Sequence, residues 1–140
     1  MALTLADVGA DVILGTFFNS SPALGNLTLK LFTNNVTPAD TDTAGTYTEA
    51  SGGGYSAITL TNGSWTLTVG DDPSDVVYAQ QTFTFTGALS GSATVYGYFV
   101  VNAGGTLLWA EQLGASFQPA NNGDTLKITP KFQLSKGTPS

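Results

Sequence analysis

The chain has no cysteine and no histidine among its 140 residues. It therefore has no disulfide, no cysteine or histidine ligand for zinc, no cysteine nucleophile and no histidine general base. Most arrangements of side chains that form enzyme active sites are excluded by this composition. We expect a protein that is not an enzyme and that carries no cofactor.

Charge is also scarce, and arginine is absent. Four lysines and ten acidic residues make up 10% of the chain and give a formal net charge of −6. Proteins that bind nucleic acids contact phosphates with clustered arginine and lysine, and this chain has no such cluster. We expect no nucleic-acid partner. Charged residues keep a protein surface in solution. Because this surface has so few of them, we expect much of it to be covered in an assembly.

Long hydrophobic runs are missing as well. No apolar run approaches the ~20 residues that a membrane-spanning helix needs, and Met1–Leu5 lacks the basic start of a secretory signal. We expect a chain with no membrane partner that is not exported. Four sequons occur, which we interpret as chance matches in a sequence rich in Asn, Ser and Thr: Asn19, Asn26, Asn35 and Asn62.

The sequence is rich in alternating β patterns. The densest apolar stretch, residues 93–113, predicts a central β-hairpin around which the other segments lie. Its first strand, Val95–Val101, is apolar on both faces, as in a buried strand, and residues 102–105 supply turn residues. Gly97 indicates a bulge or the close approach of another element.

Further strands are expected at residues 27–33, 55–61, 64–69, 76–78, 81–86 and 124–135. Asn62-Gly63 is a strong hairpin signal between two of them. Pro130 has no N–H to donate, so the last strand should lie at an edge or bulge there. The expected core consists of Leu29, Leu31, Trp65, Leu67, Phe83, Phe85, Phe99, Trp109, Ile128 and Phe132. Val69 should also point inward.

One short helix is predicted near the N-terminus. Thr4 and Asp7 have the spacing of a capping box, Val8 and Val12 recur at a helical interval, and Gly15 is a possible stop. Gly9 costs such a helix about 1 kcal/mol relative to alanine. We expect residues 1–18 to form a helical docking segment, 19–136 a β-sandwich domain and 137–140 a flexible tail.

The longest polar stretch, residues 34–54, contains turn residues, three adjacent glycines and one aromatic residue, Tyr47. A loop of this length in a small domain is usually functional or mobile. Two interpretations remain open: a surface excursion, or an arm that contacts a neighbouring subunit.

Carboxylates are the remaining candidates for site residues in this composition. Asp71, Asp72 and Asp75 could offer oxygens to calcium, but they lack the spacing of an EF-hand, and we interpret Gly70–Asp75 as a turn. Glu49 and Glu111 could serve as the carboxylate pair of a glycosidase, but neither lies in a recognisable motif. We assign no catalytic, cofactor-binding or metal-binding residue.

Six blocks of the sequence resemble a family of small virion structural proteins of tailed bacteriophages. They are LKLFTNNVTP (29–38), GGGYSAITLTNGSWT (52–66), QQTFTFTG (80–87), VYGYFVV (95–101), LLWAE (107–111) and NNGDTLKITPKFQLS (121–135). The blocks are strands and turns spread over residues 29–135, so the resemblance extends over most of the chain. The resemblance implies a jelly-roll-like capsid cement or decoration protein, or else a tail or baseplate component, and it implies no catalytic residues.

The expected fold is all-β, a jelly-roll-like sandwich or barrel of seven to nine short antiparallel strands with one N-terminal helix. The expected function is non-enzymatic binding and stabilisation of the shell of major capsid protein. We expect a chain made in the host bacterial cytoplasm and located in the virion, on the capsid surface rather than the tail. It should form a homo-oligomer, with a trimer favoured, through residues 2–18 and 34–54.

The alternative is a tail, baseplate or fibre component that binds other tail proteins or host-surface carbohydrate. In that case an exposed aromatic residue such as Trp109 or Tyr55 would stack on a sugar ring. At alternating strand positions, however, aromatic residues are more simply explained as core.

Overall fold

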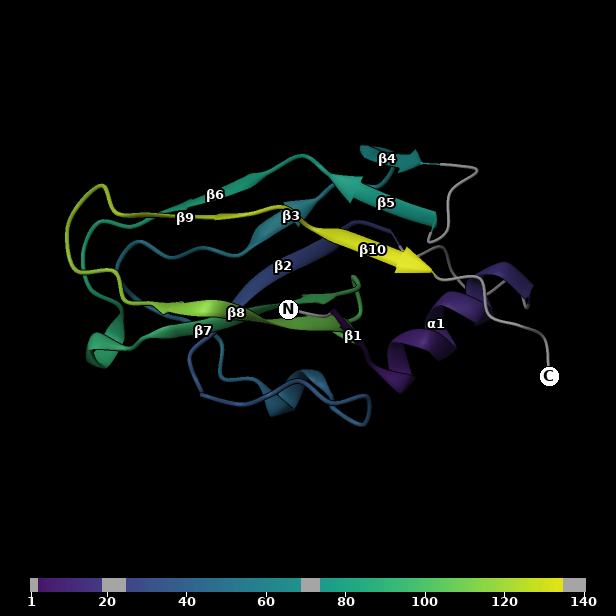
Figure 1. Cartoon of the computed structure of the whole chain (residues 1–140), viewed down its shortest axis with the longest axis horizontal. Helices are drawn as coiled ribbons and strands as arrows, with labels where there is room; N and C mark the ends of the chain where they lie inside the picture. Colours follow the sequence, from purple (N-terminus) through teal and green to yellow (C-terminus); the bar gives the residue numbers. More distant parts are fainter. Residues whose placement is uncertain (1–2, 19–24, 69–73, 135–140) are drawn as a thin grey trace.

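The computed structural model describes residues 3–18, 25–68 and 74–134, which form an all-β sandwich with one α-helix (Figure 1). All strand pairs are antiparallel. The elements are β1 (Thr4–Leu5), α1 (Asp7–Phe18), β2 (Leu27–Phe32), β3 (Ile58–Leu60), β4 (Trp65–Thr68), β5 (Ser74–Tyr78), β6 (Gln81–Thr84), β7 (Val95–Val101), β8 (Leu107–Phe117), β9 (Thr125–Ile128) and β10 (Lys131–Leu134). Two short 3₁₀ helices lie at Ala44–Thr46 and Ser90–Ser92. The predicted all-β class is confirmed, whereas the arrangement does not establish a jelly roll.

One layer is a five-stranded sheet in the order β1-β8-β7-β2-β3. The predicted central hairpin is confirmed: β7 and β8 pair with each other, and Val100 lies opposite Trp109. β2 pairs with the other edge of β7, with Leu31 opposite Tyr98. All seven residues of β7 are buried or half-buried, as expected for a strand that has a neighbour on each side.

The second layer consists of β4-β5-β10 and the pair β6-β9. The predicted last strand, residues 124–135, is wrong as a single element, because it divides into β9 and β10 at Thr129 and Pro130. Pro130 is fully buried, and its carbonyl accepts the N–H of Tyr78 at 2.9 Å. β10 lies at an edge of its sheet, as the missing N–H predicts. The division helps to bring the strand count to ten among the described residues.

The Asn62-Gly63 turn does not form the predicted hairpin. β3 belongs to the five-stranded sheet and β4 to the second layer, so the turn is a corner between layers. A type I′ hairpin turn needs positive φ at both central residues. Gly63 has φ of 85°, whereas among the described non-glycine residues only Ser92 has a positive φ. The Ser64 N–H still closes the turn on the Thr61 carbonyl at 3.2 Å.

The main core lies between the layers. It contains most of the predicted core residues, including Leu29, Phe85 and Trp109. Trp65 and Phe132 pack against this core but are only partly buried. Leu67 is a wrong prediction: its side chain is 63% exposed, because it lies beyond Trp65 along the edge strand β4, on the same face, where the core no longer covers that face. Val69 lies outside the described residues.

A second core covers the opposite face of the five-stranded sheet. It contains Phe32, Phe99 and Leu107 from the sheet, together with Ala6 before α1 and Tyr47 from the long loop. The Tyr47 ring packs 4.8 Å from Phe32 and 5.2 Å from Phe99, centroid to centroid. The long loop and the N-terminal segment therefore both contribute buried residues to the domain.

The N-terminal helix is confirmed, but its predicted ends are wrong. Thr4 lies in β1, opposite Ala110, and is not a helix cap. The helix starts at Asp7 and continues past Gly15 to Phe18. Gly9 has a packing role that the sequence does not reveal: a Cβ at this position would lie 2.7 Å from the Leu108 Cα. Glycine therefore allows α1 to lie directly on β8.

Candidate functional site

A slot on the surface lies between residues 54–58, which lead into β3, and Thr82–Thr84 of β6. We call it the β6 slot. Its cavity volume is about 390 Å³, and its eight lining residues are all uncharged. They are Gly54, Tyr55, Ser56, Ala57, Ile58, Thr82, Phe83 and Thr84.

One wall of the β6 slot is the edge of β6 that faces away from β9, and no described strand pairs with this edge. The Phe85 N–H bonds the Asp124 carbonyl at 2.8 Å, whereas the neighbouring Thr86 N–H points the other way and bonds the Gly53 carbonyl at 2.9 Å. Main-chain groups alternate in direction along a strand. Phe83 therefore bonds β9, and the N–H and C=O groups of Thr82 and Thr84 point into the slot.

Both ends of the β6 slot are tied. The Thr86–Gly53 bond closes one end, and at the other the Thr61 N–H bonds the Tyr78 hydroxyl at 3.0 Å. The first tie is a main-chain bond, whereas the second is made by the Tyr78 side chain, because the Tyr78 N–H bonds the Pro130 carbonyl. The slot is therefore an opening of limited length between two segments that run side by side.

The glycine run of the long loop forms the closed end. Gly52, Gly53 and Gly54 all have positive φ, between 55° and 76°. A Cβ on Gly53 would lie 2.6 Å from the Gly87 carbonyl oxygen. Glycine is therefore needed both for the conformation and for the close approach to the residues that follow β6.

Two stacked rings from the lining residues, Tyr55 and Phe83, lie in the interior beside the slot. Their centroids are 5.9 Å apart and their planes are tilted by 17°. Phe83 is 3% exposed and belongs to the main core, whereas Tyr55 is half-buried. Tyr55, which stacks on the buried Phe83, is therefore the ring that presents an apolar surface next to the polar walls.

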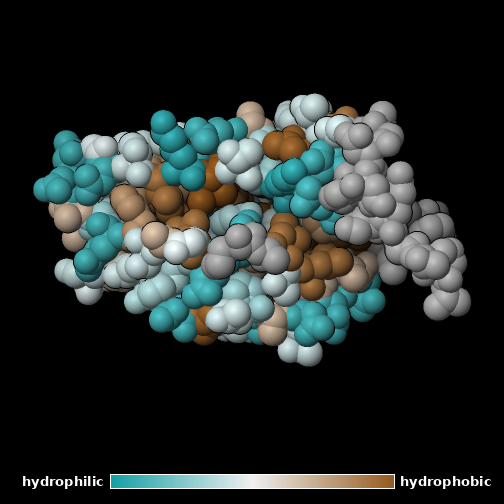
Figure 2. Space-filling model, in the orientation of Figure 1, coloured by the Kyte–Doolittle hydropathy of each residue, from teal (hydrophilic) through white to brown (hydrophobic). Residues whose placement is uncertain are grey.

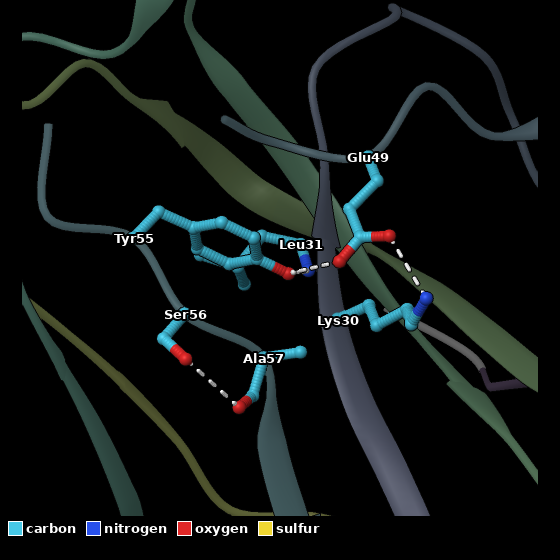
Figure 3. Close-up of polar contacts among 6 residues, drawn as sticks. All are labelled: Lys30, Leu31, Glu49, Tyr55, Ser56 and Ala57. Carbon is cyan, nitrogen blue, oxygen red and sulfur yellow. Dashed lines mark hydrogen bonds and ion pairs between the residues drawn. The ribbon is translucent and has the colours of Figure 1, made fainter. Parts of the chain in front are cut away.

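The Tyr55 hydroxyl connects the slot to an ion pair (Figure 3). It accepts the N–H of Leu31 at 3.2 Å and donates to Glu49 Oε1 at 3.1 Å. Glu49 Oε2 pairs with Lys30 Nζ at 2.8 Å. Burial raises the pKa of the Tyr55 hydroxyl above its usual value, and the nearby Glu49 carboxylate adds to this effect. The hydroxyl therefore stays protonated. It bonds β2 at Leu31, just past the point where β2 pairs with Ile58, the first residue of β3.

The structure does not bring Glu49 and Glu111 together. Glu49 lies beside the outer edge of β2, and Glu111 lies on β8, with β2 and β7 between them. Three strand spacings separate their backbones by roughly 14 Å, which exceeds the separation of paired catalytic carboxylates. Glu111 Oε2 accepts the Tyr98 hydroxyl at 2.5 Å.

The other candidate residues have structural partners. Asp75 lies in β5 rather than in the predicted turn, and it pairs with Lys131 at 2.7 Å. Asp71 and Asp72 lie outside the described residues. Within the described residues, no three carboxylates are close enough together to hold a metal ion. Trp109 is 3% exposed, so it does not offer a surface to a ligand.

Sequence reasoning named Tyr55 but missed the slot itself. The Thr-rich outer face of β6 was visible in QTFTFT, yet the direction of its main-chain groups depends on which strand pairs with it. The three adjacent glycines were the available signal, because such a run indicates a tightly constrained turn.

No known protein family, curated protein or solved structure matches the chain. Among the residues that the structure describes, no helix is both long and apolar enough to cross a membrane.

Proposed function

We propose that this chain is a non-enzymatic structural protein of a tailed-bacteriophage particle, a cement or decoration protein that binds the shell of major capsid protein. The sequence resemblance gives this class. The observation that carries the proposal is α1, a helix of mostly apolar residues that packs on β8 at Gly9 while its Val8 side chain is exposed.

The composition of α1 is unusual for a surface helix. Of its twelve residues, DVGADVILGTFF, only Asp7, Asp11 and Thr16 are polar. The Thr16 hydroxyl bonds the Val12 carbonyl within the helix at 2.9 Å, which leaves two polar side chains directed to solvent. A helix that is apolar all round is typically buried on all sides.

The packing of α1 covers only part of this apolar surface. Gly9 is buried where the helix crosses Leu108 of β8, while Val8 beside it is 36% exposed. Figure 1 shows α1 extending beyond the end of the sandwich. A partner surface on the particle would bury the exposed Val8 side chain, which supports docking through residues 2–18.

The outer edge of β8 is a second surface suited to assembly. β1 covers β8 only at Trp109 and Ala110, and no other described strand pairs with that edge. Residues 114–116 are exposed and uncharged. Natural proteins usually cover or charge such an edge. This supports association of copies of the chain, for which we propose a homotrimer.

Apolar patches lie on the side of the sandwich that Figure 2 shows. Hydrophobic atoms are visible between β9 and β10 above and β8 below. Partly buried residues of these three strands pack on the core, among them Phe117, Leu126 and Phe132. A neighbouring copy would cover both these patches and the edge of β8.

The long loop is a weaker candidate for docking than the sequence suggested. Tyr47 and Ala50 face inward, and Asn34 bonds the loop at two points, through the Thr46 carbonyl at 2.9 Å and the Thr48 N–H at 2.7 Å. We therefore place the main capsid contact on α1 and leave the loop's exposed polar residues as a secondary contact.

Electron microscopy of purified phage particles tests the proposal. Density for this chain on the shell is expected, in groups of three copies. Density at the tail or baseplate would replace the cement role with the tail role, and absence from the particle would overturn both.

A matched pair of variants tests the role of α1. Among the side chains whose burial the structure describes, the exposed large apolar residues are Val8 in α1 and Leu67 in β4. Each variant is added to particles that were prepared without this protein, and the number of bound copies is measured. Val8→Lys should lower this number at least tenfold, whereas Leu67→Lys should not. Full occupancy with Val8→Lys would contradict docking through α1.

A further inference from the structure

We propose that the β6 slot is a binding site for a single neutral sugar ring. This inference goes beyond the structural role proposed above and does not depend on it. Three features of the slot carry it: its lack of charge, its limited length, and the combination of polar walls with an aromatic interior.

The absence of charge among the lining residues selects the chemical class. A charged ligand would lose its hydration without gaining an ion pair, because all eight lining residues are neutral. Glu49 and Lys30, the nearest charged residues in the Tyr55 network, already pair with each other at 2.8 Å. The ligand is therefore a neutral molecule.

The walls favour a ligand with many groups that both donate and accept hydrogen bonds. Thr82 and Thr84 present main-chain N–H and C=O groups in alternation, and their exposed side chains add hydroxyls. Across the slot, the Ala57 carbonyl accepts only a long bond of 3.5 Å from the Ser56 hydroxyl (Figure 3). Sugar hydroxyls can match donors and acceptors on both walls.

Because both ends of the slot are tied, an extended peptide fits it less well than a compact ring does. An added β-strand would have to run out through the ends, but the Thr86–Gly53 bond blocks one end and the Tyr78 hydroxyl bridges the other. A volume of about 390 Å³ is in the range of small-molecule pockets. A compact ring fits, with its C–H face toward Tyr55.

Nuclear magnetic resonance of the ¹⁵N-labelled full chain provides the test, by titration with glucose, galactose, mannose and N-acetylglucosamine. For one small ring we expect a Kd on the order of millimolar. At least one sugar should shift the amide signals of Thr82 and Thr84, while Lys127 on the partner strand should not respond.

Two threonines that face each other across β6 and β9 provide a matched control. Thr84 lines the slot and its partner Thr125 does not, and both are exposed. Thr84→Val should weaken binding roughly 2- to 12-fold, as expected for one lost hydrogen bond. Thr125→Val should bind as the unmodified chain does. Ala57→Phe should fill the slot and abolish binding.

Three results would overturn the inference. The first is the absence of amide shifts with all four sugars at 50-fold the expected Kd. The second is sugar binding that is unchanged in both Thr84→Val and Ala57→Phe. The third is amide shifts at Thr82 and Thr84 with an acetylated, amidated Thr-Val-Thr peptide but with no sugar. None of these results bears on whether the chain occupies the phage shell.

Discussion

The ring of Phe32 lies against Gly97, its partner in the neighbouring strand β7, in the space that a side chain at position 97 would need. A Cβ built on Gly97 would overlap the Phe32 ring and the Glu111 carbonyl oxygen. The register of β7 against β8 also shifts between Val95 and Gly97. Gly97 therefore permits both a bulge in β7 and the packing of the second core.

Replacing Gly97 by alanine should destabilise the domain. Overpacking of a filled core costs about 1 to 3 kcal/mol or more, since neither the ring nor the backbone oxygen can move freely. Gly114 on β8 is the control, because a Cβ there meets nothing within 4 Å. Urea unfolding should show a large loss for Gly97→Ala and little change for Gly114→Ala. Equal stabilities would contradict the packing of Phe32 over Gly97.

Tyr47 should fix the long loop to the sheet. Its ring packs between Phe32 and Phe99, and its hydroxyl donates to Asp42 Oδ2 at 2.7 Å. Tyr47→Ala should cost about 3 to 5 kcal/mol. Tyr47→Phe keeps the ring and should cost about 0.5 to 1.5 kcal/mol, the contribution of one hydrogen bond.

Limited proteolysis and urea unfolding together measure this effect. Tyr47→Ala should speed cleavage within residues 34–46, while Tyr47→Phe should stay close to the unmodified chain. Rapid cleavage of the unmodified chain in this loop would show instead that the loop is not anchored by its aromatic residue.

The sequence predicted where strands form better than it predicted which strands pair with each other. The apolar pattern of β7 and β8 and the alternation of Leu29 with Leu31 depend on local order, and both predictions were confirmed. Which sheet a strand joins depends on contacts that are distant in the sequence. The Asn62-Gly63 turn is the clearest case, because a dipeptide typical of hairpins forms a corner between two layers.

Burial was predicted well where both faces of a strand are covered and poorly at edges. Leu67 alternates with Trp65 in the sequence, as two core residues would, but β4 is an edge strand and only Trp65 reaches the core. The second core was missed, because nothing local shows that Tyr47 packs on Phe99. The candidate slot depends on which edge of β6 remains open, and that follows from the pairing with β9.

Truncation of Phe99 should destabilise the domain strongly, whereas truncation of Leu67 should have little effect. Phe99 is 3% exposed and lies in the second core, so Phe99→Ala should cost about 3 to 5 kcal/mol. Leu67 is 63% exposed, and Leu67→Ala should change the free energy of unfolding by less than about 0.5 kcal/mol. Thermal unfolding of both variants checks this, and a large loss for Leu67→Ala would mean that the Leu67 side chain is buried.

Asp124 should make the stability of the domain sensitive to acid. Its carboxylate accepts the N–H groups of Ala120 at 2.8 Å and Asn121 at 2.9 Å, which lowers its pKa below the ordinary value of 3.8. The folded state therefore binds this proton less readily than the unfolded state does. The resulting stabilisation is present above about pH 4 and is lost as the pH falls through the lowered pKa.

Asp124→Asn separates this titration from the hydrogen bonds. The amide keeps one acceptor oxygen but carries no charge, and bonds to a charged acceptor are the stronger ones. The variant should be less stable than the unmodified chain at pH 7, and the two should converge as the pH is lowered toward 3. Urea unfolding at pH 3, 4, 5 and 7 measures the two curves. Parallel curves would show that the Asp124 carboxylate has the same pKa in the folded and unfolded chains. The negative charge of Asp124 would then not stabilise the turn before β9.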